Sequence, residues 1–178
     1  MPTYREATKT DAENIALLHA ANWQLNYRGI LDDYYLDHQV EADRRKVWSE
    51  RLSTPDNTMY IVLAEEEGML IGFGCIFLEE SETYGAYLDN LHVLADYSGR
   101  GIGKVLMSLL ARKVIAKEGR NDMYLWVLRD NKGAIRLYEK LKGERKEQVT
   151  EKEIGNDPVE KIRYYWPDVS DLIVEESS

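Results

Sequence analysis

Three glycines alternate in the segment Ser98-Gly99-Arg100-Gly101-Ile102-Gly103, between an apolar strand-like stretch (88–94) and a helical apolar pattern that begins at Ile102. Glycine lets the backbone turn tightly with its amides pointing outward. The start of a helix adds unpaired N–H groups and the positive end of the helix dipole. Because such amides bind phosphate oxygens, the segment predicts a ligand that carries a pyrophosphate or a similar anion.

Two common phosphate loops do not fit this segment. A Walker loop requires glycine where Ser98 stands and a magnesium-binding hydroxyl where Val105 stands. A dinucleotide fingerprint would place its last glycine at Lys104 or at Leu106, according to the starting glycine. ATP and NAD are therefore disfavoured as ligands, and a glycine-rich turn without a ligand is the remaining structural alternative.

The composition is that of a soluble globular protein, with 44% hydrophobic and 31% charged residues among 178. The formal net charge of −9 argues against nucleic acid or an anionic membrane as the main partner. No apolar run approaches the ~20 residues that span a membrane, and the first residues lack a signal-peptide core. Cys75, the only cysteine, lies in an apolar run and is interpreted as a core residue in a reducing compartment. We therefore expect a cytoplasmic protein.

Apolar periodicity predicts one mixed α/β domain over residues 1–166, followed by an acidic tail, 167–178, that frays. A capping-box pattern at Thr10 and Glu13 marks the first helix. The order of elements favours a central, mostly antiparallel sheet with helices on both faces. The expected strands cover residues 3–7, 59–64, 69–78, 84–94, 123–128, 144–153 and 159–166, and the expected helices cover 11–24, 41–52, 101–117 and 131–141.

A second motif, N-x-x-A-x-x-x-Y, runs from Asn131 to Tyr138, and the glycine segment fits (Arg/Gln)-x-x-G-x-(Gly/Ala) apart from Ser98 at its first position. With these motifs and its order of elements, the chain resembles the GNAT superfamily of acyl-CoA-dependent N-acyltransferases. The resemblance is specific over residues 88–143. It departs from the family pattern at Ser98, at a missing proline near Ala95 and at Lys142, where many members have glycine.

The resemblance implies acetyl-CoA as the cosubstrate, with no metal. The sheet would splay between the strand before the glycine segment and the strand at 123–128, and the pantetheine arm would pair with the exposed backbone there. Asn131 would contact this arm or cap its helix. The residues expected to bind the cosubstrate are Leu91, Val93, Ser98, Gly99, Arg100, Gly101, Ile102, Gly103, Lys104 and Asn131.

The resemblance also implies direct acetyl transfer to a primary amine. Tyr138 would protonate the departing thiolate, and packing in the core is its structural alternative. Asp89, a carboxylate within an apolar strand, is the first candidate for the proton acceptor. His92 is the second, although strand alternation places it opposite Asp89, Leu91 and Val93 unless a bulge intervenes. A structural role for either residue remains open.

The acceptor site is expected between the first two helices, by resemblance to bacterial members of the superfamily. Trp23, Tyr27 and Tyr34 would hold an apolar part of the acceptor, and Asp32 and Asp33 would hold a cation. The alternative is a set of aromatic residues at the core edge beside a solvated acidic loop. A peptide N-terminus, a polyamine, an amino acid and an aminoglycoside-like amine all remain open as acceptors.

Two further expectations concern the protein as a whole. An acyl-CoA sensor that binds without turnover is the alternative function on the same fold. A homodimer is expected at the level of the superfamily, with an exposed Tyr165 or Trp166 at its contact.

Overall fold

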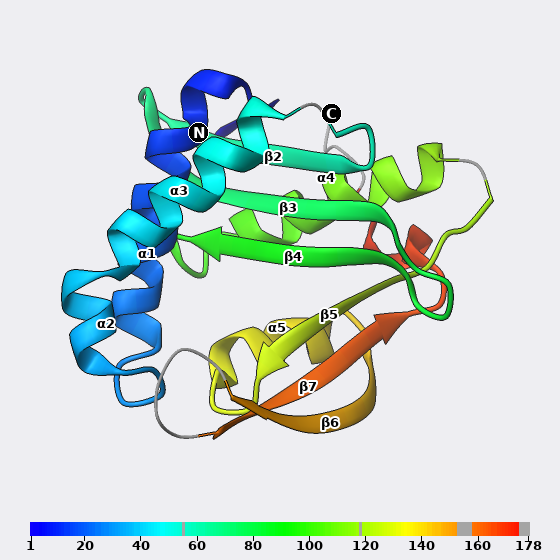
Figure 1. The fold of residues 1–178 in the computed structure, drawn as a ribbon. Coiled ribbons are helices and arrows are strands. Elements are labelled where there is room, and N and C mark those ends of the chain that lie inside the picture. The colour runs from blue at the N-terminus through cyan, green and yellow to red at the C-terminus, as the bar shows by residue number, and fades with distance from the viewer. Residues whose placement is uncertain (55, 118, 153–157, 175–178) are drawn as a thin grey trace.

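The computed structural model describes residues 1–54, 56–117, 119–152 and 158–174. These residues form a sheet in the order β1-β2-β3-β4-β5-β7-β6, in which all neighbouring strands are antiparallel except β4 and β5 (Figure 1). The expected mixed, mostly antiparallel sheet is confirmed. The strands are β1 (Thr3–Glu6), β2 (Met59–Glu66), β3 (Met69–Ser81), β4 (Gly85–Val93), β5 (Met123–Leu128), β6 (Glu144–Lys152) and β7 (Pro158–Trp166).

Helices cover both faces of the sheet, as expected (Figure 1). α1 and α3 pack on one face of β2 and β3, and α4 packs on the other face. α5 joins the same core as α4 and packs beside β7 through Tyr138. The short helix α2 was not predicted; Asp32 caps it by accepting a hydrogen bond from the Tyr35 amide at 2.8 Å. The helices are α1 (Ala12–Asn26), α2 (Asp33–His38), α3 (Val40–Ser53), α4 (Ile102–Ala116) and α5 (Lys132–Lys140).

The sheet opens between β4 and β5, which pair only at Ala86 with Met123 and at Tyr87 with Tyr124. Past these pairs the two strands diverge (Figure 1). Gly85 holds the closed end together, since a side chain there would lie 2.3 Å from the carboxylate of Asp122. The expected splay is confirmed, and it leaves one edge of β4 facing a gap.

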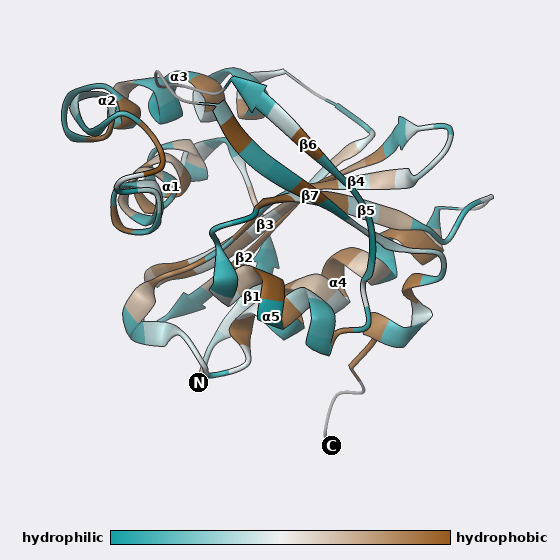
Figure 2. Cartoon of the chain, turned by 90° about the horizontal axis from the view of Figure 1, so that it is seen from below, coloured by the Kyte–Doolittle hydropathy of each residue, from teal (hydrophilic) through white to brown (hydrophobic). Residues whose placement is uncertain are grey.

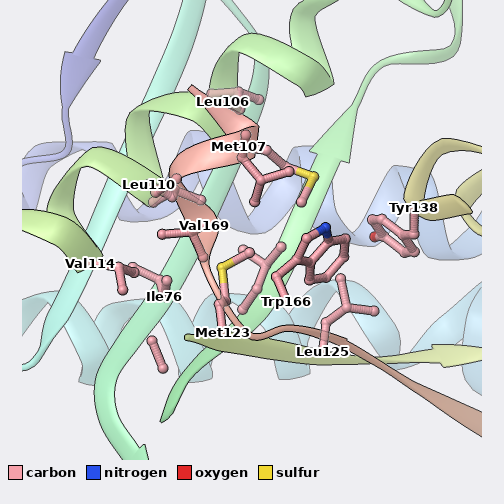
Figure 3. Packing of buried hydrophobic residues seen from close by; sticks show 14 of the residues in the cluster. Ile76, Leu106, Met107, Leu110, Val114, Met123, Leu125, Tyr138, Trp166 and Val169 are labelled. Atoms are coloured by element: carbon pink, nitrogen blue, oxygen red, sulfur yellow. The ribbon is translucent and has the colours of Figure 1, made fainter. Parts of the chain in front are cut away.

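The main core lies between the sheet and the helices α4 and α5 (Figure 3). Trp166 is only 2% exposed, and its indole N–H donates to the Leu141 carbonyl at 2.9 Å. The prediction of an exposed Trp166 is therefore wrong. Gly143 is required beneath this ring, because a Cβ there would lie 2.7 Å from it. The edge strand β6 is mostly hydrophilic (Figure 2), in keeping with its exposed position.

Cys75 lies in the core as predicted, whereas the capping box and the segment after Trp166 differ from the prediction. Cys75 is fully buried, and burial raises the pKa of its thiol to about 12, so it is the expected core residue. The capping box is formed by Thr8 and Asp11 ahead of α1, in the short 3-10 turn η1 (Lys9–Asp11), rather than by Thr10 and Glu13. Part of the segment after Trp166, expected to fray, forms the turn η3 (Val169–Leu172), whose two end residues are buried against the core. Residues 175–178 of that segment lie outside the described residues.

Candidate active site

A cavity of about 620 Å³ lies at the opening of the sheet. Its walls come from α1, the splayed ends of β4 and β5, the glycine loop at the start of α4, and α5. It therefore joins the two sequence motifs with the segment expected to bind the acceptor. The predicted residues that line it are Trp23, Tyr27, Asp89, Leu91, Val93, Ser98, Gly99, Gly101, Ile102, Gly103, Lys104, Asn131 and Tyr138.

The glycine loop has the geometry of an anion site made of backbone amides. Gly99 and Gly101 have φ values of +78° and +81°, which L side chains rarely adopt, and Gly101 caps the N-terminus of α4. The side chain of Arg100 turns away and pairs with Glu66 at 2.6 Å, so only its amide remains for the site. The loop and the first amides of α4 fit the pyrophosphate of CoA.

The free edge of β4 fits an extended arm. The Leu94 amide donates to β3 at the Ile71 carbonyl, 2.9 Å away, so by strand alternation Leu91 and Val93 direct their backbone groups into the gap. Asn22 of α1 already donates its side-chain amide to the Val93 carbonyl at 3.0 Å. This contact was not predicted, and it leaves the Val93 N–H as the group that remains directed at the opening.

A β-bulge at Asp89 changes which face each residue of β4 occupies. Cys75 pairs with Asn90 and Ile76 with Leu88, so Asp89 is one extra residue in its strand. His92 and Asp89 consequently lie on the same face, toward α1 and α3. This is the bulge that the sequence-based prediction allowed for, and it removes the alternation that would have placed His92 opposite Asp89.

The carboxylate of Asp89 is engaged by other groups. It accepts a hydrogen bond from Arg51 of α3 at 2.7 Å and another from the Asn90 side chain at 2.5 Å. Asp89 also raises the pKa of Tyr87, although burial is the larger cause. Both hydrogen bonds go to Oδ2, so donors from α3 and from β4 itself already occupy that oxygen.

His92 is one of the residues that line the cavity, and its ring packs against His19 with the two ring centroids 4.5 Å apart. Burial lowers the pKa of His92 to about 4, against the opposing effect of the Asp89 charge. The pKa of His19 is also lowered, first by burial and then by the charge of His92. Both imidazoles are therefore neutral at pH 7; the same lowered pKa makes His92 a weaker base than a free imidazole.

Tyr138 projects from α5 into the main core beside Trp166 and reaches the cavity (Figure 3). Burial raises the pKa of its phenol well above 10, and the charge of Tyr27 adds to the rise. The phenol therefore stays protonated, as a proton donor must. Asn131 also lies at the cavity and caps α5, its side-chain oxygen accepting from the Ala134 amide at 3.2 Å.

Not all the residues expected to bind the acceptor reach the cavity. Trp23 and Tyr27 line it. Asp32 is engaged as the cap of α2, and Asp33 pairs with Arg28. Tyr34 is 64% exposed and packs on His38 outside the cavity. The structure thus gathers the aromatic residues of α1 and leaves the acidic ones outside.

Sequence reasoning missed two buried polar residues of α1. His19 and Asn22 are 2% and 6% exposed and lie on the same helical face as Ile15 and Leu18. A polar side chain at an apolar position of a helix is a signal that the sequence does contain. Trp126 of β5, which also lines the cavity, carries no comparable signal.

The described residues hold neither a candidate metal site nor a helix suited to crossing a membrane. No group of three or more His, Cys, Asp or Glu in that part of the chain is arranged to hold a metal ion. None of its helices has both the length and the apolar character needed to cross a membrane. The expectation that no metal takes part stays a prediction.

Comparison with known proteins agrees with this geometry. The model of the acetyltransferase (GNAT) family matches residues 23–143, and the chain belongs to that family as a GNAT-type N-acetyltransferase. An uncharacterized N-acetyltransferase of Bacillus subtilis, YuaI, is 27% identical over 97% of this chain and 96% of its own length. An uncharacterized N-acetyltransferase of Methanocaldococcus jannaschii, MJ1207, is 33% identical over 83% of this chain and 62% of its own length.

Solved structures show the same fold at low sequence identity. The PaiA N-acetyltransferase of Thermoplasma acidophilum in complex with coenzyme A superimposes with a TM-score of 0.70 at 20% identity, covering 93% of this chain and 99% of that one. YncA of Salmonella typhimurium, with acetyl-CoA, gives a TM-score of 0.68 at 18% identity, covering 100% of this chain and 97% of that one. The GNAT resemblance and the fold class are confirmed.

Proposed function

We propose that the protein transfers an acetyl group from acetyl-CoA to the primary amine of a small molecule or a peptide. The observation that carries this proposal is the cavity itself, which joins the glycine loop, the free edge of β4 and Tyr138. The solved relatives that contain coenzyme A or acetyl-CoA support the choice of cosubstrate. The amides from residue 99 to residue 104 would bind the pyrophosphate, and Leu91 and Val93 would pair with the pantetheine arm.

In the transfer step, the amine nitrogen forms a bond to the thioester carbonyl carbon, and the bond from that carbon to sulfur breaks. The Val93 N–H, directed into the gap, would stabilise the oxygen that becomes negative. Tyr138 would give its proton to the departing sulfur. Its phenol is protonated at neutral pH; burial raises its pKa and so weakens it as an acid until the negative sulfur forms beside it.

The amine must also lose a proton before or during its attack. We propose His92 for this role ahead of Asp89: both residues line the cavity, but Arg51 already engages the Asp89 carboxylate at 2.7 Å, whereas the His92 imidazole is neutral. Asp89 would then support His92 and attract the cationic acceptor. Since the bulge places both residues on one face, this division of roles can be tested by replacing each in turn.

The direct test is to incubate the protein with acetyl-CoA and a panel of amines, and to follow both the release of free thiol and the mass of the product. Thiol release that depends on an amine, with an acetylated product, supports the proposal. Saturable CoA binding without transfer to any amine would favour the acyl-CoA sensor instead. A cytoplasmic location and a homodimer stay predictions. Of the two residues expected at the dimer contact, Trp166 is buried, and the hydroxyl of Tyr165 donates a hydrogen bond to Asp122 at 3.1 Å.

A further inference from the structure

Three buried donor atoms gather where α1, α2 and α3 meet. The described residues contain four buried side-chain polar atoms without a hydrogen-bond partner, and three of them are His19 Nε2, Tyr35 Oη and Arg44 Nε. Trp23 connects them to the cavity: the guanidinium of Arg44 lies 4.6 Å from the centroid of its ring, and the His19 ring packs edge-on at 4.9 Å. Each such atom left unpaired in the interior is costly, so a cluster of them indicates a binding site.

All three atoms are donors. The Trp48 indole N–H donates to His19 Nδ1 at 3.0 Å, so the neutral ring carries its proton on Nε2. Burial, and then the neighbouring Asp43, raise the pKa of Tyr35 to about 12, which keeps its hydroxyl protonated. Arg44 is a donor at every pH. The cluster therefore offers three N–H or O–H groups, and the carboxylate beside it is that of the exposed Asp43, which interacts with the Tyr35 hydroxyl.

The charge of Arg44 has no ion-pair partner among the described residues. Arg51 of the same helix pairs with Asp89. Arg45, the exposed residue next to Arg44 in the sequence, pairs with Glu13 and Glu41. Arg44 is half-buried and still lacks such a partner, while the nearby Asp43 is exposed. One full positive charge and two neutral donors match a monoanion, and they suit a carboxylate better than a doubly charged phosphate.

The cluster is one residue away from the proposed proton acceptor. His19 packs against His92 with ring centroids 4.5 Å apart, and both His92 and Trp23 line the cavity. His19, Tyr35 and Arg44 lie behind the lining residues Trp23 and His92, so a molecule with its amine at His92 would have to place an anionic group past the Trp23 ring to meet them. Trp23, Tyr27 and Trp126 provide apolar walls for the rest of the molecule.

We propose that the acceptor amine also carries a carboxylate, and that Arg44, Tyr35 and His19 bind it. An amino acid with an apolar side chain has this chemistry. The inference rests on the proposed acetyl transfer, and it selects one of the acceptor classes that the sequence left open.

The test compares acceptors that differ only by the carboxylate: phenylalanine against phenethylamine, and leucine against isopentylamine. The amino acid of each pair is expected to have a kcat/KM about 10- to 100-fold higher, the value of a charged hydrogen bond. Arg44→Met keeps the packing on Trp23 and is expected to bring this ratio close to one. Tyr35→Phe removes only the hydroxyl and is expected to lower the ratio by a smaller factor.

Arg45→Met is the matched control, since it removes the adjacent but exposed arginine and should leave the ratio unchanged. A wild-type ratio of one or less, or equal ratios in the Arg44 and Arg45 variants, would overturn the inference. Calorimetric binding of both members of each pair in the presence of CoA separates this failure from that of the proposed function. Carboxylate-dependent binding that Arg44→Met abolishes supports the subsite even without turnover, whereas transfer to the plain amines alone supports acetyl transfer and rejects the subsite.

Discussion

The two sides of the cavity are built in different ways. On the cosubstrate side, the groups proposed to meet the ligand are backbone amides of a glycine loop and of the free edge of β4. On the acceptor side, they are side chains brought from α1, β4 and β5, with arginines of α3 behind them. A backbone site depends on conformation and tolerates many side chains, whereas a side-chain site depends on the identity of each residue. Substitutions should therefore act differently on the two sides.

The largest effect is expected from a change of conformation in the glycine loop. Gly101→Val should raise the Kd of acetyl-CoA at least about 100-fold in a calorimetric titration, since the amides at the start of α4 lose their alignment. Gly68→Val is the matched control, because Gly68 has almost the same φ of +78° and equally open surroundings in the turn between β2 and β3. Both variants should lose about 1–2 kcal/mol of stability, but only the first should lose affinity. Equal affinities would refute the backbone site.

Removing the proposed acid should act on turnover alone. Tyr138→Phe keeps the packing against Trp166, and it should lower kcat about 100-fold while the Kd of acetyl-CoA stays the same. Tyr164→Phe, in the same aromatic cluster, loses only a hydrogen bond to Glu139 and should keep its kcat. An unchanged kcat in the Tyr138 variant would exclude that residue as the acid.

The two candidates for the proton acceptor can be separated by replacing each. His92→Gln should lower kcat/KM about 10- to 100-fold across all amines, and the loss should shrink as the pH rises toward the pKa of the amine. Asp89→Asn should lower it less, and it should also weaken the contact between α3 and β4 that Arg51 makes. If Asp89→Asn lowered kcat/KM more than His92→Gln at every pH, Asp89 and not His92 would be the proton acceptor.

A smaller effect is expected on stability at acid pH. His19 and His92 have lowered pKa values, so the unfolded chain binds more protons than the folded chain below pH 6.5. Stability should therefore fall as the pH drops from 6.5 toward 4, by up to about 1.4 kcal/mol per pH unit for each group. The free energy of unfolding, measured with urea at several pH values, should fall less steeply with decreasing pH in His92→Gln than in the wild type. His38→Gln, which replaces an exposed histidine, should keep the wild-type dependence on pH. Identical slopes would show that His92 is not buried as a neutral ring.

The same contrast explains what the sequence could predict. The glycine loop, Asn131 and Tyr138 lie in two local motifs, and local spacing is enough to place them. The positions of His92 and Asp89 depend on one bulge, which pattern reading allowed for but could not locate. The approach of Arg51 to Asp89 and the engagement of Asp32 in a helix cap depend on tertiary packing. The position of the candidate backbone site could thus be predicted from local sequence, whereas the arrangement of the side chains depends on tertiary packing.

The most direct test of the central claim is thermal unfolding of the wild-type protein with acetyl-CoA, CoA, ATP or NAD in excess. At 100 times its Kd, a ligand that binds the folded chain adds about 2.7 kcal/mol of stability, a shift that is easily measured. We predict this shift with acetyl-CoA and CoA and none of this size with ATP or NAD. A shift with a nucleotide that exceeds the CoA shift, or no shift with CoA, would contradict the assignment of the glycine loop to acetyl-CoA.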